Sequence, residues 1–320
     1  MRRRMLVLHH LISRTRGCSA VLVGIFLFSP STSAWAHASS SESDASPVLP
    51  SEPPDQFVRD VLTHELEAQS QDHSLWCFHE LRTEDGIQKL LHVCQTAEGQ
   101  IERLVALNGR PLTAKQATDE DRRIRNLLHD PGEIKARRKK DREDGEQARK
   151  LLKLFPEAFH YRYDGLAGNF VRLKFAPNPQ FHPSRHSEQV FHHMEGTLLL
   201  DPAQERLAEI DGKLTSEVKF LGGLLGHLDK GGTFSVKQQD VGCHCWEVTL
   251  MDIHMNGKAL FFKTINVRMF EQYTDFRPSP SGLGLAKAAE LVKGSEDSAR
   301  VPDDCHVALA GSSSQTISAE

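Results

Sequence analysis

Apolar and polar residues alternate along much of the chain beyond residue 158, and this period of two predicts strands. The stretch 205–220 shows the pattern over its greatest length. One face carries Ala208, Ile210, Leu214, Val218 and Phe220, with Gly212 and Ser216 between them, and charged residues and Thr215 line the other face. So long a one-sided strand, with a glycine inside it, predicts a strongly bent sheet.

Further strands are predicted where the alternation recurs between turn residues. Their expected ranges are 74–83, 87–96, 100–107, 189–200, 233–241, 244–255 and 258–275, with shorter runs around Tyr161 and Leu173. Asp85-Gly86 and Asn256-Gly257 are dipeptides that favour two-residue hairpin turns. We expect the first to join 74–83 to 87–96 and the second to join the last two strands.

Two regions have the helical period of 3.6 instead. From Asp55, a predicted N-cap, one helical face carries Phe57, Val58, Val61, Leu62 and Leu66. Thr113 and Gln116 have the spacing of a capping box, which predicts a second helix that ends near residue 130. A third helix is expected from about 132 to 155, where oppositely charged side chains four residues apart indicate a solvated face.

These elements predict the α+β class. We expect a strongly curved, incompletely closed antiparallel sheet, a half-barrel of about ten or eleven strands, covered by about three helices. This domain would span 55–276 with a helical insertion at 113–155. A Ser/Pro-rich leader at 37–54 and most of a tail at 277–320 are expected to be disordered, apart from a short helical piece at 286–293.

The first 36 residues have the pattern of a secretory signal peptide. A basic start, MRRRM, precedes an apolar run of about ten residues and a small-residue site that ends at Ala36. That run is too short to span a membrane as a helix. Its removal takes five arginines and no acidic residue, so the formal net charge falls from −4 to −9. We therefore expect a periplasmic or secreted, acidic protein that spans no membrane and binds no nucleic acid.

Five cysteines remain after this cleavage. A turn at Asp85-Gly86 places Cys77 opposite Cys94 at a non-hydrogen-bonded pair, where cross-strand side chains are closest. A disulfide between them is expected in an oxidising compartment, with two buried free thiols as the alternative. The pairing of Cys243, Cys245 and Cys305 stays open. A metal site built from Cys243, His244 and Cys245 has the wrong spacing for the usual zinc motifs.

The glycine-rich stretch 220–234, FLGGLLGHLDKGGTF, resembles a phosphate loop at first sight. It lacks the lysine position of a Walker A loop and the first glycine of a dinucleotide fingerprint, and a strand follows it rather than a helix. Its leucines have helical spacing: Leu221, Leu224, Leu225 and Leu228. We expect either a loop that folds these leucines onto the core or an apolar flap at the mouth of a cavity.

The sequence contains no G-x-S-x-G nucleophile elbow and no recognised Cys/His signature. We therefore expect no enzyme and no cofactor.

The chain resembles the LolA/LolB-like superfamily of periplasmic lipoprotein carriers. The resemblance is one of architecture over about 55–276: a leading amphipathic helix, helices inserted after the first strands, and a long run of bent strands. The stretches FAPNPQFHPSR, MEGTLLLDPAQERLAEIDGKL and GKALFFKTI also resemble those of poorly characterised secreted bacterial proteins with that fold. It implies an unclosed sheet with helices as a lid over an apolar cavity for acyl chains. The residues expected to line that cavity, or else to pack as plain core, are Leu173, Phe175, Ile210, Leu214, Val218 and Phe220.

The leading hypothesis from the sequence is thus a carrier or binder of lipid or lipoprotein acyl chains. Two alternatives stay open: an envelope interaction or sensor domain that uses the same sheet to bind a protein, and a Cys/His metal-binding protein. The cavity volume beneath the helices would distinguish the first two.

Overall fold

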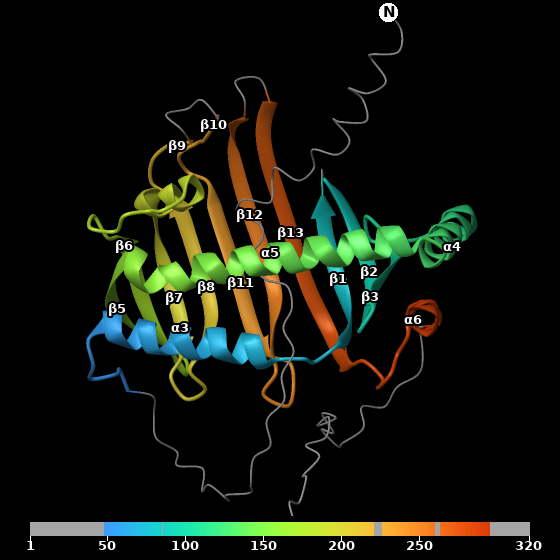
Figure 1. Ribbon diagram of the computed structural model, residues 1–320, viewed down its shortest axis with the longest axis horizontal. Coiled ribbons are helices and arrows are strands. Elements are labelled where there is room, and N and C mark those ends of the chain that lie inside the picture. The colour runs from blue at the N-terminus through green and yellow to red at the C-terminus, as the bar shows by residue number, and fades with distance from the viewer. Residues whose placement is uncertain (1–47, 85, 221–225, 260–262, 295–320) are drawn as a thin grey trace, which may run out of the picture.

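The computed structural model describes residues 48–84, 86–220, 226–259 and 263–294. Within these ranges an antiparallel sheet of thirteen strands carries helices on both faces (Figure 1). The predicted α+β class and the curved, open sheet covered by helices are confirmed. The described strands outnumber the predicted ten or eleven.

The sheet runs from edge strand β4 to edge strand β5 in the order β4-β3-β2-β1-β13-β12-β11-β8-β7-β6-β5. The first strands are β1 (Trp76–Glu84), β2 (Ile87–Thr96), β3 (Gly99–Leu107), β4 (Arg110–Pro111), β5 (Phe159–Ala167) and β6 (Phe170–Pro177). The remaining strands are β7 (Met194–Asp201), β8 (Arg206–Leu214), β9 (Val218–Phe220), β10 (Gly226–Leu228), β11 (Thr233–Asp240), β12 (Trp246–Ala259) and β13 (Lys263–Pro278). The short β9 and β10 pair with each other, and β10 also pairs with β12.

Two long helices cross one face of the sheet (Figure 1). These are α3 (Pro54–Gln71) and α5 (Pro131–Ala158), and α5 extends from β5 to beyond β2. A 3₁₀ helix, η2 (His186–His193), precedes β7. Helices α4 (Ala114–Leu128) and α6 (Leu285–Leu291) pack at the β2–β3 end, where Ile124 of α4 and Ala288 of α6 join Cys94 and Ile101 in a smaller core.

The main core lies between α3, α5 and the strands from β5 to β13. Phe57, Val58, Val61 and Leu62 of α3 are buried there, as the helical period predicts. The capping box of Thr113 and Gln116 is also confirmed at the start of α4. None of the helices in the described ranges is long and apolar enough to cross a membrane.

A pair of glycines lies in the middle of the helix-covered face. Gly196 of β7 pairs with Gly212 of β8, and their outer neighbours in the same row are Phe175 and Phe234. A Cβ atom on Gly212 would lie 2.3 Å from the Phe234 ring, and one on Gly196 would lie 2.7 Å from the Phe175 ring. The glycines therefore let two aromatic rings of the core fold over the backbone.

Several predicted features differ in the structure. Helix α3 begins at Pro54 with Pro53 as its N-cap, so Asp55 is not the N-cap. The strand expected at 205–220 is divided into β8 and β9, and the first half of 189–200 is η2. Asn256 and Gly257 form no hairpin turn: both lie in β12, opposite Asn266 and Ile265 of β13. Gly257 instead allows β10 to approach, because a Cβ there would lie 2.1 Å from the His227 carbonyl oxygen.

The chain beyond 276 contributes more than the sequence indicates. Strand β13 continues to Pro278, and Leu283, Ala288 and Val292 are buried against β2 and β3. The domain therefore includes residues as far as the last α6 turn, which the predicted boundary at 276 leaves out.

Candidate functional site

The six residues predicted to line a cavity gather on the helix-covered face. Leu173, Phe175, Ile210, Leu214 and Val218 are all buried in the main core, and Phe220 packs against its margin as a partly buried side chain. The aromatic rings of Phe155 and Phe159 contact Phe175 directly, with centroids 5.3 Å and 4.8 Å away. These six residues are therefore brought together as core, and their contact with a ligand stays a prediction.

The predicted flap falls mostly outside the described residues. Leu221, Leu224 and Leu225 belong to the undescribed segment 221–225. Leu228, expected in the same helical turn, lies instead in strand β10, where it pairs with Val218 and Gly257 and is buried in the core. The spacing of Leu228 from the other leucines is that of a helix, but the pairing of β10 with β9 and β12 determines its conformation.

Helix α5 is anchored unevenly over the sheet. Its buried residues are Gly145, Ala148, Leu151, Leu152, Phe155 and Ala158, all in its C-terminal half. The half from Pro131 to Asp144 is mostly charged and exposed, with Ile134 half-buried. Helix stability in proteins comes mainly from packing of an apolar face. The N-terminal half of α5 therefore needs less free energy to move than the C-terminal half.

Three acidic side chains lie together on the helix-covered face: Glu80 of β1, Glu102 of β3 and Glu271 of β13. Arg82 Nε lies 2.5 Å from Glu80 and 3.4 Å from Glu271, and Tyr273 donates a 2.6 Å hydrogen bond to Glu271. Burial raises the pKa of Glu80 to about 7, although Arg82 opposes the shift. At neutral pH this carboxyl group is therefore only partly ionised.

A second buried carboxylate connects helix α3 to the sheet. Glu65 has no exposed surface, and it accepts hydrogen bonds from Arg206 Nε at 2.7 Å, the Leu207 backbone N–H at 3.1 Å and Gln69 Nε2 at 2.7 Å. The Arg206 guanidinium also stacks over the Trp246 ring, 5.5 Å from its centroid. This network fixes α3 in register with β8 and is a structural rather than a binding feature.

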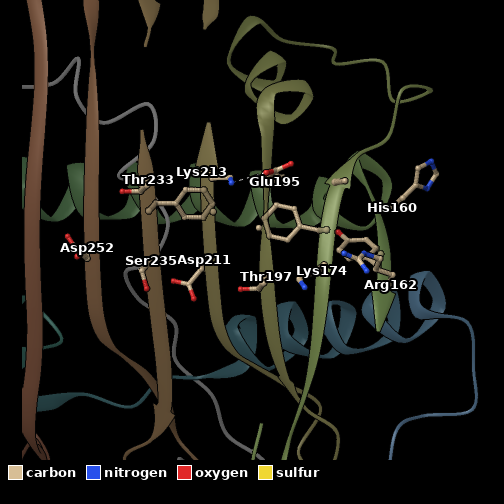
Figure 2. Close-up of a pocket in the computed structure, with 16 residues that line it drawn as sticks. His160, Arg162, Lys174, Glu195, Thr197, Asp211, Lys213, Thr233, Ser235 and Asp252 are labelled. Atoms are coloured by element: carbon tan, nitrogen blue, oxygen red, sulfur yellow. Dashed lines mark ion pairs between the residues drawn. The ribbon is translucent and has the colours of Figure 1, made fainter. Parts of the chain in front are cut away.

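Opposite α3 and α5, no described helix covers the sheet over the strands from β5 to β12, and we call this area the helix-free face. It carries a hollow of about 710 Å³. Figure 2 views it from that side, with the blue and green helices behind the strands. Ten polar side chains line it: His160, Arg162, Lys174, Glu195, Thr197, Asp211, Lys213, Thr233, Ser235 and Asp252. We call this hollow the polar groove.

The charges of the polar groove are partly paired. Lys213 lies 3.0 Å from Glu195, and Lys174 lies 2.7 Å from Asp164, beside the groove. Burial raises the pKa of Glu209, beside Asp211 on β8, and the hydrogen bond between these two carboxyl groups raises it further. A surface with carboxylates, hydroxyls and cations in one hollow can bind a polar ligand through many hydrogen bonds.

The sequence pattern showed part of the polar groove. Asp211 and Lys213 belong to the polar face of 205–220, but strands from β5 to β12 contribute the other residues. Which of them lie side by side depends on strand register, which the alternation does not reveal.

The Cys243-His244-Cys245 segment is a turn that precedes β12, whereas the predicted strand 244–255 begins within it. Cys243 and His244 both have a φ of 59°, in the left-handed region that is unusual for residues other than glycine. Cys243 is disulfide-bonded, and Cys245 is a half-buried free thiol whose pKa burial raises to about 11. Cys305 lies outside the described residues, among which no three His, Cys, Asp or Glu side chains converge as metal ligands.

The predicted Cys77–Cys94 disulfide is confirmed. The two residues are direct partners in the β1–β2 hairpin, as the Asp85-Gly86 register requires, and their sulfur atoms are bonded.

Comparisons with known proteins give little further information. No family model matches the chain, and none of the curated proteins matches it. A crystal structure of a DUF1329 family protein from Desulfovibrio piger shares 10% sequence identity with a TM-score of 0.27, and the match covers 74% of this chain and 98% of that chain. A score this low carries no argument about fold or function. The structure itself thus defines an α+β protein with an open sheet, one face of which is covered by helices while the other carries the polar groove.

Proposed function

We propose that this protein is an exported, non-catalytic carrier or binder of lipid or lipoprotein acyl chains, which would enter between α5 and the sheet. The observation that carries the proposal is the uneven anchoring of α5 over a broad apolar face. Its charged N-terminal half covers the sheet, while its buried side chains begin at Gly145. A helix anchored at one end can lift at the other and uncover strand surface beside the apolar core.

The apolar margin of the core provides the site where a chain would begin to insert. Phe220, Val267 and Met269 are partly buried and pack against the main core. Each methylene group of an acyl chain that leaves water contributes about 0.8 kcal/mol. Many methylenes can therefore offset the cost of lifting half a helix, and the flexible side chain of Met269 can adapt to the inserted chain.

A fluorescent fatty acid tests this proposal directly. Titration into the purified protein should give saturable fluorescence enhancement, and Met269→Lys should weaken binding about tenfold or more, because a charge in the apolar margin opposes insertion. Leu166→Lys, at an exposed leucine of β5, is the matched control and should bind like the wild type. An absence of saturable binding, together with no lipid co-purified in native mass spectra, would contradict the proposal.

The interaction-domain alternative is tested by a separate measurement. Pull-down from envelope extracts that recovers a specific protein, in a sample that binds no fatty acid, would favour an envelope interaction domain over an acyl-chain carrier.

A further inference from the structure

The polar groove contains a row of side chains that continues across six strands. Its members, in order from β5 to β12, are Arg162, Lys174, Thr197, Asp211, Ser235 and Asp252. Each is the direct cross-strand partner of the next, so all six lie on the helix-free face (Figure 2). With neighbouring strands about 4.8 Å apart, the row is roughly 24 Å long.

The middle of this row suits a ligand that is rich in hydroxyl groups. Asp211 and Asp252 offer carboxylate oxygens as acceptors, and Thr197 and Ser235 offer hydroxyls that both donate and accept. Glu209 adds a second carboxyl group beside Asp211. This local excess of acidic groups favours hydrogen-bond donors and disfavours an anionic group of the ligand at this position.

The β5–β6 end of the row has the opposite charge. Arg162, Arg172 and Lys174 gather there with one carboxylate, Asp164, whose pKa is lowered by its hydrogen bond from Lys174. Guanidinium groups bind carboxylates with two parallel hydrogen bonds. This end is therefore complementary to a carboxylate of the ligand.

The row also suits a linear sugar chain by its spacing. The length of one sugar unit in an extended chain is close to the distance between neighbouring strands.

We infer that the helix-free face of the sheet binds a linear, carboxylated oligosaccharide, which lies across β5–β12 with an acidic sugar at the β5–β6 end and its hydroxyl groups over Asp211 and Ser235. The inference goes beyond the proposed acyl-chain binding, which uses the opposite face. The polar groove is open and lacks deep apolar pockets in its lining, so it does not suit the buried side-chain anchors typical of a protein partner.

Calorimetric titration of the purified protein tests the inference. The probe is a hexamer of β-1,4-glucose that carries one glucuronate at its end, and the neutral control is the hexamer of β-1,4-glucose. The acidic hexamer should bind about tenfold or more tightly than the neutral one, since loss of a charge-assisted hydrogen bond costs about 1.5 kcal/mol or more.

Two variants locate the binding. Asp211→Asn and Arg162→Gln should each weaken binding of the acidic hexamer about tenfold. Both side chains lie on the open face, so neither change disturbs the core. Arg138→Gln, on the exposed side of α5, is the control and should leave binding unchanged.

Three results would overturn the inference. These are no binding of the acidic hexamer at millimolar concentration, equal binding of the acidic and neutral hexamers, and binding that neither Asp211→Asn nor Arg162→Gln weakens. Fatty acid binding by the same sample is independent of all three results.

Discussion

Glu80 and Glu65 are buried carboxyl groups whose surroundings differ in kind. Glu65 has a guanidinium, a backbone N–H and side-chain amides around it. Glu80 has Arg82 as its close cation, and that cation also lies 3.4 Å from Glu271. The several hydrogen bonds to Glu65 stabilise its carboxylate. Burial instead raises the pKa of Glu80 to about 7.

The raised pKa of Glu80 predicts stability that depends on pH. The unfolded chain releases this proton near pH 4.5 and the folded chain near pH 7, so folding is favoured below about pH 4.5 and this contribution is lost as the pH rises to about 7. Glu80→Gln removes the effect. Between pH 4.5 and 7.5, the free energy of unfolding of the wild type should fall by roughly 2–3 kcal/mol relative to this variant in urea denaturation.

The control for this measurement is Glu67→Gln, at an exposed position of α3. Its pH dependence should match that of the wild type. Parallel pH profiles for the wild type and Glu80→Gln would show that the Glu80 carboxyl group does not titrate in this range.

Removal of the Glu65 carboxylate should be strongly destabilising. Glu65→Ala leaves Arg206, about nine-tenths buried, without its carboxylate partner. Breaking a buried pair in this way costs about 3–5 kcal/mol of unfolding free energy. Urea denaturation measures the loss, with Glu67→Ala two residues along the same helix as the control. A change below about 1 kcal/mol would show that the pair is not an essential connection between α3 and β8.

At the scale of elements, helices protect both edges of the sheet. Asp55 of α3 accepts a 2.9 Å hydrogen bond from the Tyr161 backbone N–H of edge strand β5. On β3, Glu120 of α4 accepts from the Leu104 N–H at 2.8 Å, and Arg123 donates to the Glu102 carbonyl at 2.5 Å. Free backbone groups at a sheet edge promote pairing with other chains. These side chains therefore act against edge-to-edge association.

This arrangement predicts that loss of the α4 contacts causes self-association. The double variant Glu120→Ala/Arg123→Ala exposes the backbone of β3 and should form dimers or larger species at micromolar concentration, as measured by light scattering after size exclusion. Asp119→Ala/Arg122→Ala removes a comparable but exposed ion pair from the same helix and should stay in the wild-type state. If both variants behave alike, edge protection by α4 is contradicted.

At the scale of the whole molecule, one sheet separates two chemically different faces. The face under α3 and α5 carries the main apolar core over the strands from β5 to β13, and beside this core lies the charged group of Glu80, Arg82 and Glu271. The opposite face carries the polar groove over β5–β12 (Figure 2), and α4 and α6 cover part of that face at the β2–β3 end. Acyl chains and polar ligands could therefore bind independently.

The amino-acid sequence by itself determined the local features. The capping box at Thr113, the face of α3 and the Cys77–Cys94 pair all follow from residues close together in the chain, where periodicity and a two-residue turn suffice. Asn256-Gly257 shows the limit of such rules, because the approach of β10 overrides its turn preference.

Only the tertiary structure decided the row of polar side chains from Arg162 to Asp252, the uneven anchoring of α5 and the protection of the sheet edges. These features depend on register and packing between segments distant in sequence, and local propensities contain no information about which strands become neighbours.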